Sequence, residues 1–203
     1  QCRRCVSGGN RVQGIGVLNA QNRGFNTIIG PALGLSISEV DCTNCGQCVA
    51  ACPVNALSET NGIQKVWDAI NDPDIRTVVQ VAPAVRVAIG EEFGLPTGEA
   101  ATGKLATALK EMLFDDIFDT NFAADLTIME EGSELLERVS AAVKTGKAVL
   151  PMITSCSPGW IKYLEHHYPD RTANLSTCKS PHMMMGAVIK SYYANKLGID
   201  PHK

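Results

Sequence analysis

The sequence lacks any apolar segment close to the roughly 20 residues that a membrane-spanning helix needs. It also lacks the basic start and apolar core of a signal peptide and a complete glycine-rich nucleotide fingerprint. Neither sign of charge dominates, because 18 basic and 21 acidic residues give a formal net charge of −3. Such a near-neutral chain has no electrostatic footprint for nucleic acid or an anionic membrane. We therefore expect no membrane segment and no nucleic-acid partner.

Cysteine, by contrast, is plentiful and unevenly placed, since six of the 8 cysteines precede residue 53. Residues 42–53 read C-x2-C-x2-C-x3-C-P, a spacing typical of thiolates that bind a cubane iron–sulfur cluster. Zinc is the alternative, but zinc patterns usually form two distant pairs or include histidine. Reduced thiols at metal-ligand spacings favour a reducing compartment, so we expect a cytoplasmic protein.

The length and the cysteine distribution predict two domains. The 203 residues are enough for a small module and a larger domain, and we expect the module over residues 1–62 and the domain over residues 63–203. The sequence begins at Gln1 inside a cysteine motif and ends in a helix-stop pattern over residues 198–203. We therefore expect a fragment of a longer protein.

The first region predicts an α+β, ferredoxin-like two-cluster module, with short strands over residues 12–18 and 27–30 and a short helix within residues 48–56. The second region alternates strands, predicted over residues 77–83, 117–122 and 148–154, with helices, predicted over residues 102–113, 125–143, from 158 onward and 180–196. This alternation predicts an α/β domain with a parallel sheet, whose functional loops follow the carboxyl ends of its strands.

Cys156 lies in a loop between a predicted strand and a predicted helix. The positive end of the helix dipole favours thiolate over thiol at such a position. The residue could therefore be a nucleophile, a metal ligand or a proton donor. The alternative is a buried cysteine in a tight turn.

Three charged residues, Glu131, Glu134 and Arg138, share one face of a predicted helix beside its apolar stripe. Carboxylates that are half buried at such a border have pKa values raised toward the range of proton carriers. The alternative is an ordinary solvated face, on which a Glu134–Arg138 pair contributes a few tenths of a kcal/mol.

Five segments together resemble [FeFe]-hydrogenases, namely residues 42–53, 81–94, 124–131, 154–160 and 175–181. The resemblance implies a ferredoxin-like electron relay followed by the first half of a hydrogen-forming domain, which would catalyse the reversible reduction of protons to H2. The implied cofactors are two 4Fe-4S clusters in the relay and an H-cluster, a 4Fe-4S cluster joined to a diiron subcluster. The implied partners are a ferredoxin or another electron carrier, H2 and protons, and hydrogenase maturation proteins. A hydrogenase-like sensor and an iron–sulfur assembly relative remain alternatives.

The resemblance also implies roles for single residues. Cys156 would be the proton donor beside the distal iron. In the family, protons then pass through a glutamate, a serine and a second glutamate, and these positions match Glu134, Ser176 and Glu131. Arg138 matches an arginine near the surface. Around the H-cluster the resemblance implies cofactor-binding positions, which are Ala82, Pro83, Ala84, Ser157 and Lys179. Cys178 is expected to be a buried cysteine near the site.

The chain departs from the family pattern at two positions. Ser157 stands where the family has a cysteine that ligates the H-cluster, so Ser157 supplies an oxygen ligand, Cys156 takes over the ligand role, or the cluster is weakened. In the relay, the resemblance implies one cube on Cys42, Cys45 and Cys48 and another on Cys2, Cys5 and Cys52. The fourth ligand of the first cube would stand four residues after Cys5, where the chain has Gly9. A cube with three cysteines is expected to be the more labile one.

Overall fold

The computed structural model describes residues 2–202, which form two compact units. The first unit contains the chain up to Asn61 together with Ser157–Leu175, and the second contains Gly62–Cys156 and the chain from Ser176 onward. Each unit thus combines two separate stretches of sequence. Among the described residues, no helix is both long enough and apolar enough to cross a membrane.

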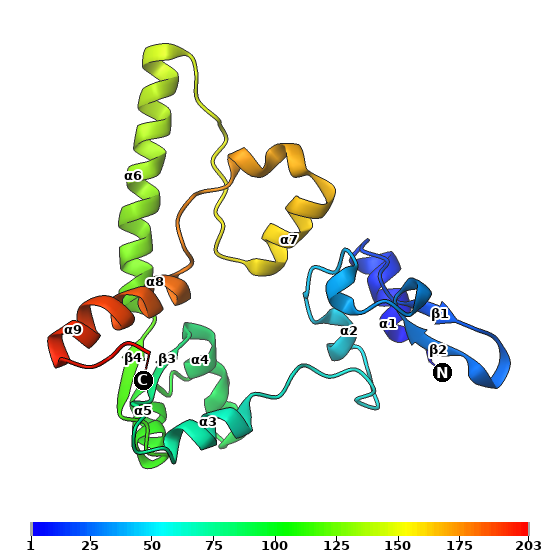
Figure 1. The fold of residues 1–203 in the computed structure, drawn as a ribbon, viewed down its shortest axis with the longest axis horizontal. Coiled ribbons are helices and arrows are strands. Elements are labelled where there is room, and N and C mark those ends of the chain that lie inside the picture. The colour runs from blue at the N-terminus through cyan, green and yellow to red at the C-terminus, as the bar shows by residue number, and fades with distance from the viewer. Residues whose placement is uncertain (1, 203) are drawn as a thin grey trace. The chain divides into compact units, whose positions relative to one another are not determined.

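The first unit combines short helices with one antiparallel hairpin (Figure 1). Its helices are α1 (Arg4–Ser7), α2 (Gln47–Ala50) and α7 (Pro158–His167), and its strands are β1 (Asn19–Gln21) and β2 (Ile28–Gly30). A π-helical turn over Gly8–Val12 continues α1, and short 3-10 turns occupy Gly24–Asn26, Ala32–Gly34, Ile37–Glu39 and Pro169–Asn174. In the hairpin, Asn19 pairs with Gly30.

The strand predicted over residues 12–18 is wrong, whereas β2 confirms the one predicted over residues 27–30. Gly14 and Gly16 have φ angles of 69° and 73°, a left-handed conformation that glycine tolerates and an extended strand does not contain. The N–H of Ile15 donates to the Gly9 carbonyl at 2.9 Å. The two glycines therefore turn the chain back, and the strand begins only at Asn19.

The second unit is built on a parallel pair of strands, β3 (Val78–Val81) and β4 (Asp116–Asp119), with Val78 opposite Asp116. Its helices are α3 (Ile63–Ile70), α4 (Pro83–Glu92), α5 (Thr102–Glu111), α6 (Asn121–Thr145), α8 (Pro181–Val188) and α9 (Ala194–Leu197), with a π-helical turn over Ile189–Tyr193 between the last two. These elements confirm the predicted parallel sheet and the helices predicted at 102–113, 125–143 and 180–196 within a few residues.

The third strand predicted in this region, over residues 148–154, is wrong. Within this segment only Ile153 makes an isolated bridge. Two carbonyls of residues 148–154 accept hydrogen bonds from groups outside any strand. The Ile153 oxygen accepts from the Ser176 N–H at 2.7 Å, and the Val149 oxygen accepts from Arg138 at 3.3 Å. An apolar β-branched run forms a strand only where a neighbouring strand can satisfy its backbone.

The core of the second unit lies where α8 packs against the beginning of α6 (Figure 1). Ala123, Met184 and Met185 are buried there, and Ala123 has no exposed surface. The Thr127 hydroxyl donates to the Ala123 carbonyl at 2.8 Å, so this buried hydroxyl has a hydrogen-bond partner. This packing brings the segment before α8, residues 176–180, toward α6.

Asp116, at the start of β4, joins three segments of the second unit. Arg76 donates to one of its carboxylate oxygens at 2.7 Å, and the Tyr193 hydroxyl donates to the other at 2.9 Å. The hydrogen bond from Arg76, followed by that from Tyr193, holds the pKa of the Asp116 carboxyl below its usual value. The Tyr193 ring also packs edge-on against Phe118, with ring centroids 5.1 Å apart.

We predict that Asp116→Asn lowers the free energy of unfolding at neutral pH by about 1 kcal/mol, since the charged hydrogen bonds weaken and Arg76 is partly solvated. The folded-state pKa of Asp116 is depressed, so its stabilisation is complete above the unfolded-state pKa of about 3.9 and disappears as the pH falls through the folded value. Urea unfolding of the metal-free chain, followed by circular dichroism between neutral and acid pH, measures both effects. The exposed control Asp125→Asn should still lose stability as the pH falls. Equal curves of unfolding free energy against pH for the two variants would contradict the prediction.

Candidate functional site

A carboxylate, Glu134 on α6, is surrounded by hydrogen-bond donors from another part of the sequence. The Ser176 hydroxyl donates to its Oε2 at 2.7 Å, and the Thr177 N–H donates to the same oxygen at 3.1 Å. Arg138, one turn later on α6, donates from Nε to Oε1 at 3.0 Å. The side chains of Glu134 and Arg138 are only 15% and 16% exposed, so this ion pair is shielded from water.

The segments around Glu134 are tied to one another by backbone and hydroxyl groups. The Ser176 N–H donates to the Ile153 carbonyl, and the Ser155 hydroxyl donates to the Cys178 carbonyl at 2.9 Å. Arg138 adds a third tie through the Val149 carbonyl. The loop that begins at Ser176 and the segment that leads to Cys156 are therefore both held against α6.

Cys178 completes the shell around the carboxylate. Its Sγ lies 3.7 Å from Glu134 Oε2, and its N–H donates to the Ser176 hydroxyl oxygen at 3.1 Å. Burial raises the pKa of the Cys178 thiol, and the charges of Glu134 and Glu131 raise it further. The residue is half buried beside the network, so it stays a thiol that can donate to the carboxylate.

The pKa of Glu134 lies below its usual value, contrary to the expectation for a half-buried carrier. Burial is the largest single influence and raises the pKa, but the hydrogen bonds from Ser176, Arg138 and Thr177 together outweigh it. The carboxylate is thus held as an anion. Glu131, one turn earlier on α6, is half buried, and its charge acts on the Cys178 thiol.

The remaining residues predicted for the H-cluster site are exposed. Cys156 and Ser157 are exposed, and the Ser157 side chain does not cap α7 although Pro158 opens that helix. Ala82, Pro83 and Ala84 follow the carboxyl end of β3 and begin α4, and Lys179 is exposed just before α8. Nearby, Arg86 of α4 forms an ion pair with Asp119 at the end of β4.

In the first unit, several cysteines line one cavity. Its walls come from α1, the π-helical turn, the loop before α2 and α2 itself, and its cysteines are Cys5, Cys42, Cys45 and Cys48. Gly9 also lines it. The Asn44 N–H donates to Cys42 Sγ at 3.4 Å, and burial raises the pKa of the Cys48 thiol. Cys2 is exposed, and the N–H of Ala56 donates to Cys52 Sγ at 3.2 Å.

This cavity suits a cluster better than a single ion. Within residues 2–202 no three His, Cys, Asp or Glu side chains converge closely enough to bind one metal ion. A cubane differs from a single ion because each of its cysteines binds a separate iron, so the sulfur atoms stand apart around a shared space. Three cysteines from one loop and one short helix line one cavity, and their shared wall fits such a cluster.

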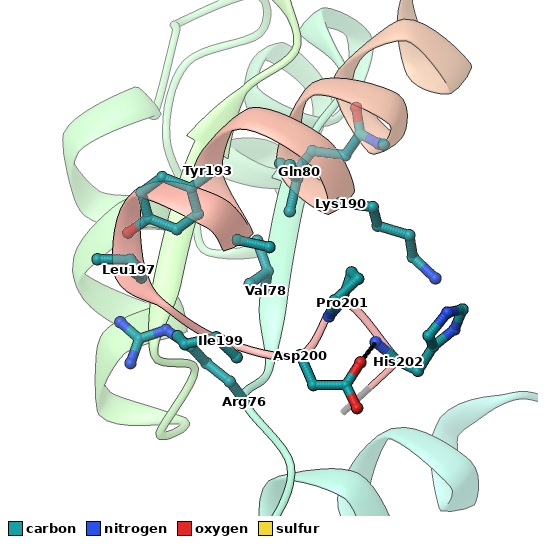
Figure 2. Close-up of a pocket in the computed structure, with 13 residues that line it drawn as sticks. Arg76, Val78, Gln80, Lys190, Tyr193, Leu197, Ile199, Asp200, Pro201 and His202 are labelled. Atoms are coloured by element: carbon teal, nitrogen blue, oxygen red, sulfur yellow. Dashed lines mark hydrogen bonds between the residues drawn. The ribbon is translucent and has the colours of Figure 1, made fainter.

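Another cavity lies in the second unit, and sequence reasoning did not point to it. It has a volume of about 340 Å³ and is shown in Figure 2. Val78 and Gln80 of β3 line it together with Lys190, Tyr193 and the segment from Ile199 to His202. None of the predicted site residues lines it. The contacts that sequence reasoning missed are the Thr177 N–H and the Cys178 thiol on Glu134, and no local pattern could have identified them.

Comparison with known proteins gives a consistent result. The family described as iron only hydrogenase large subunit, C-terminal domain, matches residues 75–203, and a 4Fe-4S binding domain matches residues 35–58. NADP-reducing hydrogenase subunit HndD of Solidesulfovibrio fructosivorans is 51% identical over 100% of this chain and 35% of the relative. The periplasmic [Fe] hydrogenase large subunit of Nitratidesulfovibrio vulgaris is 45% identical over 82% of this chain and 47% of the relative.

Solved structures agree with this result. The apo [FeFe]-hydrogenase HydA1 of Chlamydomonas reinhardtii aligns with a TM-score of 0.65 and 48% identity over 70% of this chain and 36% of that one. A more distant relative, cytosolic iron-sulfur assembly component 3 of Rattus norvegicus, is 30% identical over 82% of this chain and 36% of the relative. The chain spans less than half the length of each of these proteins.

We predict that Ser176→Ala raises the pKa of Glu134, because the anion loses its closest hydroxyl donor while its burial stays the same. Titration of the side-chain carboxyl by NMR, with ¹³C-labelled glutamate, measures the change. Thr177→Ala is the matched control, since Thr177 donates through its backbone N–H and the substitution leaves that group in place. An unchanged pKa in Ser176→Ala, or an equal rise in the control, would contradict this account.

Proposed function

Because the chain belongs to the iron-only hydrogenase large-subunit family, we propose that it forms part of an enzyme that reversibly reduces protons to H2. The observation that carries the proposal is the 2.7 Å hydrogen bond between Ser176 and Glu134, which joins two candidate proton carriers that are 42 residues apart in sequence. A hydroxyl in contact with a shielded carboxylate is the minimal unit of a proton relay.

Residues 1–62 form the proposed electron-relay module, and residues 63–203 form part of the proposed H-cluster domain. In the relay, Cys42, Cys45 and Cys48 would hold one 4Fe-4S cluster, as their shared cavity supports. The second cluster would use cysteines from the other group, Cys2, Cys5 and Cys52. The 4Fe-4S binding domain found at residues 35–58 contains the first set and Cys52.

The residues that would hold the H-cluster come from the start of α4, directly after β3, and from the segments on either side of α7. They are Ala82, Pro83, Ala84, Cys156, Ser157 and Lys179. The carboxyl ends of parallel strands are where such sheets bind ligands, which supports the positions after β3. When bound, the H-cluster supplies the metal centre at which protons and electrons combine.

The contacts support an order for the proton carriers that differs from the one implied by the resemblance. Arg138, the expected surface end of the path, forms its ion pair with Glu134. We therefore assign Glu134 to the outer side of Ser176 and Glu131 to the inner side, toward Cys156. The path would run through Cys156, Glu131, Ser176 and Glu134 to Arg138.

The Ser176 hydroxyl is oriented for transfer to Glu134. Its oxygen accepts from the Cys178 N–H, so its own proton is free to point at the carboxylate. A serine that gives its proton to Glu134 must take another from its opposite side, where Glu131 would supply it. Because Arg138 and Thr177 stabilise the anion of Glu134, the protonated state is transient and the next transfer is not impeded.

Two other functions share the family and remain candidates. An iron–sulfur assembly role is favoured by the more distant similarity to cytosolic iron-sulfur assembly component 3, and a sensor role would keep the same cofactor. The hydrogen-bonded Ser176–Glu134–Arg138 set favours the enzyme, because a sensor would turn over only slowly and an assembly protein needs no proton path. Proposed partners are a ferredoxin or another electron carrier and the hydrogenase maturation proteins. The proposed compartment is the cytoplasm, although one relative is named as periplasmic.

We predict that Glu134→Gln reduces H2 turnover by about 100-fold or more in a full-length, maturated hydrogenase that carries this segment, because the amide cannot carry the proton. Gas-phase H2 production with a chemical reductant measures the loss. Glu137→Gln, on the exposed side of the same helix, is the matched control and should retain activity. Full turnover in Glu134→Gln would reject the proposed proton path.

We also predict that Ser157→Cys increases retention of the H-cluster's cubane in the same full-length protein, since a thiolate is a softer and more acidic ligand than a serine hydroxyl. Bound iron after a timed challenge with a chelator measures retention. The control Thr154→Cys adds a thiol three residues earlier and should not increase the amount of iron retained. Equal iron loss from the parent protein and Ser157→Cys would show that position 157 does not ligate the cluster.

A further inference from the structure

Cys156, the proposed proton donor, stands at the end of a stretch of the second unit. This stretch runs from Gly62 to Cys156, and the next residue, Ser157, belongs to the first unit. Cys156 is exposed, so packing in a core does not hold it in place. Its position relative to the second unit therefore depends on the residues directly before it.

Two hydrogen bonds fasten those residues to the loop before α8. The Ile153 carbonyl accepts from the Ser176 N–H at 2.7 Å, and the Ser155 hydroxyl donates to the Cys178 carbonyl at 2.9 Å. The first bond joins two backbone groups, so it does not depend on the side chains. The second needs a side-chain donor at position 155, directly before Cys156, and serine and threonine carry such a hydroxyl on their Cβ.

The acceptor of the Ser155 hydrogen bond belongs to the residue that also orients Ser176. The Cys178 N–H donates to the Ser176 hydroxyl oxygen at 3.1 Å, and Ser176 donates in turn to Glu134 at 2.7 Å. Ser176 is only 6% exposed, so its surroundings restrict where it can move. Through its main chain, Cys178 thus connects the segment of Cys156 with the Ser176–Glu134 pair.

We propose that Ser155 is a positioning residue for proton transfer, whose hydroxyl holds the Cys156 segment at a fixed distance from the Ser176–Glu134 pair. This inference rests on the proposed proton path. Ser155 neither gains nor loses a proton in this role, because its hydrogen bond to a backbone carbonyl only fixes where Cys156 stands. A donor that is misplaced by about 1 Å transfers its proton far more slowly, since transfer requires hydrogen-bond reach.

The first test uses a full-length, maturated hydrogenase that carries this segment. Ser155→Ala should reduce H2 production by about 10- to 100-fold, because the Cys156 segment is released from its place. The ratio of turnover in H2O to turnover in D2O should rise, since proton transfer becomes the slow step. The infrared spectrum of the bound H-cluster should stay the same, which separates misplacement of the donor from loss of the cofactor.

Two further variants separate the hydroxyl from a general disturbance of the segment. Ser155→Thr keeps a hydroxyl on the Cβ and should restore both the turnover and the isotope ratio. Thr154→Ala removes a hydroxyl from the exposed neighbouring residue and should leave both quantities unchanged. If Ser155→Thr is as slow as Ser155→Ala, the hydroxyl is not responsible and the inference is overturned.

A second measurement uses this chain without cofactors, so it does not depend on maturation. In Ser155→Ala the Ser176 N–H should exchange with D2O several times faster than in the parent chain, as followed by NMR, because its acceptor Ile153 lies on the released segment. The pKa of Glu134 should not change, since its own donors are untouched. Equal exchange rates of this N–H in the two chains would overturn the inference.

The turnover assay distinguishes failure of this inference from failure of the proposed function. Unchanged turnover and an unchanged isotope ratio in Ser155→Ala, beside a loss of activity in Glu134→Gln, would overturn the inference alone. Full activity in both variants would overturn the proposed proton path as well.

Discussion

A carboxylate that is shielded from water needs hydrogen-bond donors from the protein. In this chain the donors to Glu134, and the further bonds that those donors make, connect three segments of the second unit. Glu134 on α6 receives Ser176 and Thr177 from the loop before α8 and Arg138 from its own helix. Arg138 in turn bonds to the segment that leads to Cys156. Leaving such an anion unsatisfied would cost several kcal/mol in a buried setting, so the positions of these loops depend on one another.

The same interaction sets the chemistry of the proposed proton path. The donors that stabilise the anion lower the pKa of Glu134, whereas burial alone would raise it. A carrier of this kind releases a proton readily and holds one only briefly. The hydrogen bond from the Cys178 backbone to Ser176 gives the serine hydroxyl a direction, which a solvated serine would lack. Positioning of donors, more than a raised pKa, is therefore what suits this site to proton transfer.

In the first unit, cysteines from separate segments line one cavity. Cys5 and Gly9 stand one turn apart, and both line the cavity of Cys42, Cys45 and Cys48. In two-cluster ferredoxins the fourth cysteine of such a motif ligates the other cluster, so both groups of cysteines contribute to each cluster.

The sequence by itself determined what depends on residues close together in the chain. The spacing of Cys42, Cys45 and Cys48 indicated a cluster, and the four-residue step from Glu134 to Arg138 indicated an ion pair, because one loop or one helical turn sets these distances. The resemblance placed Ser176 on one path with Glu134. Only the tertiary structure decided that Thr177 and Cys178 also contact Glu134, since the packing of α8 on α6 brings them there. It also decided that residues 148–154 form no strand and that the pKa of Glu134 falls. Both outcomes depend on which donors arrive from distant segments, and a local pattern carries no information about those partners.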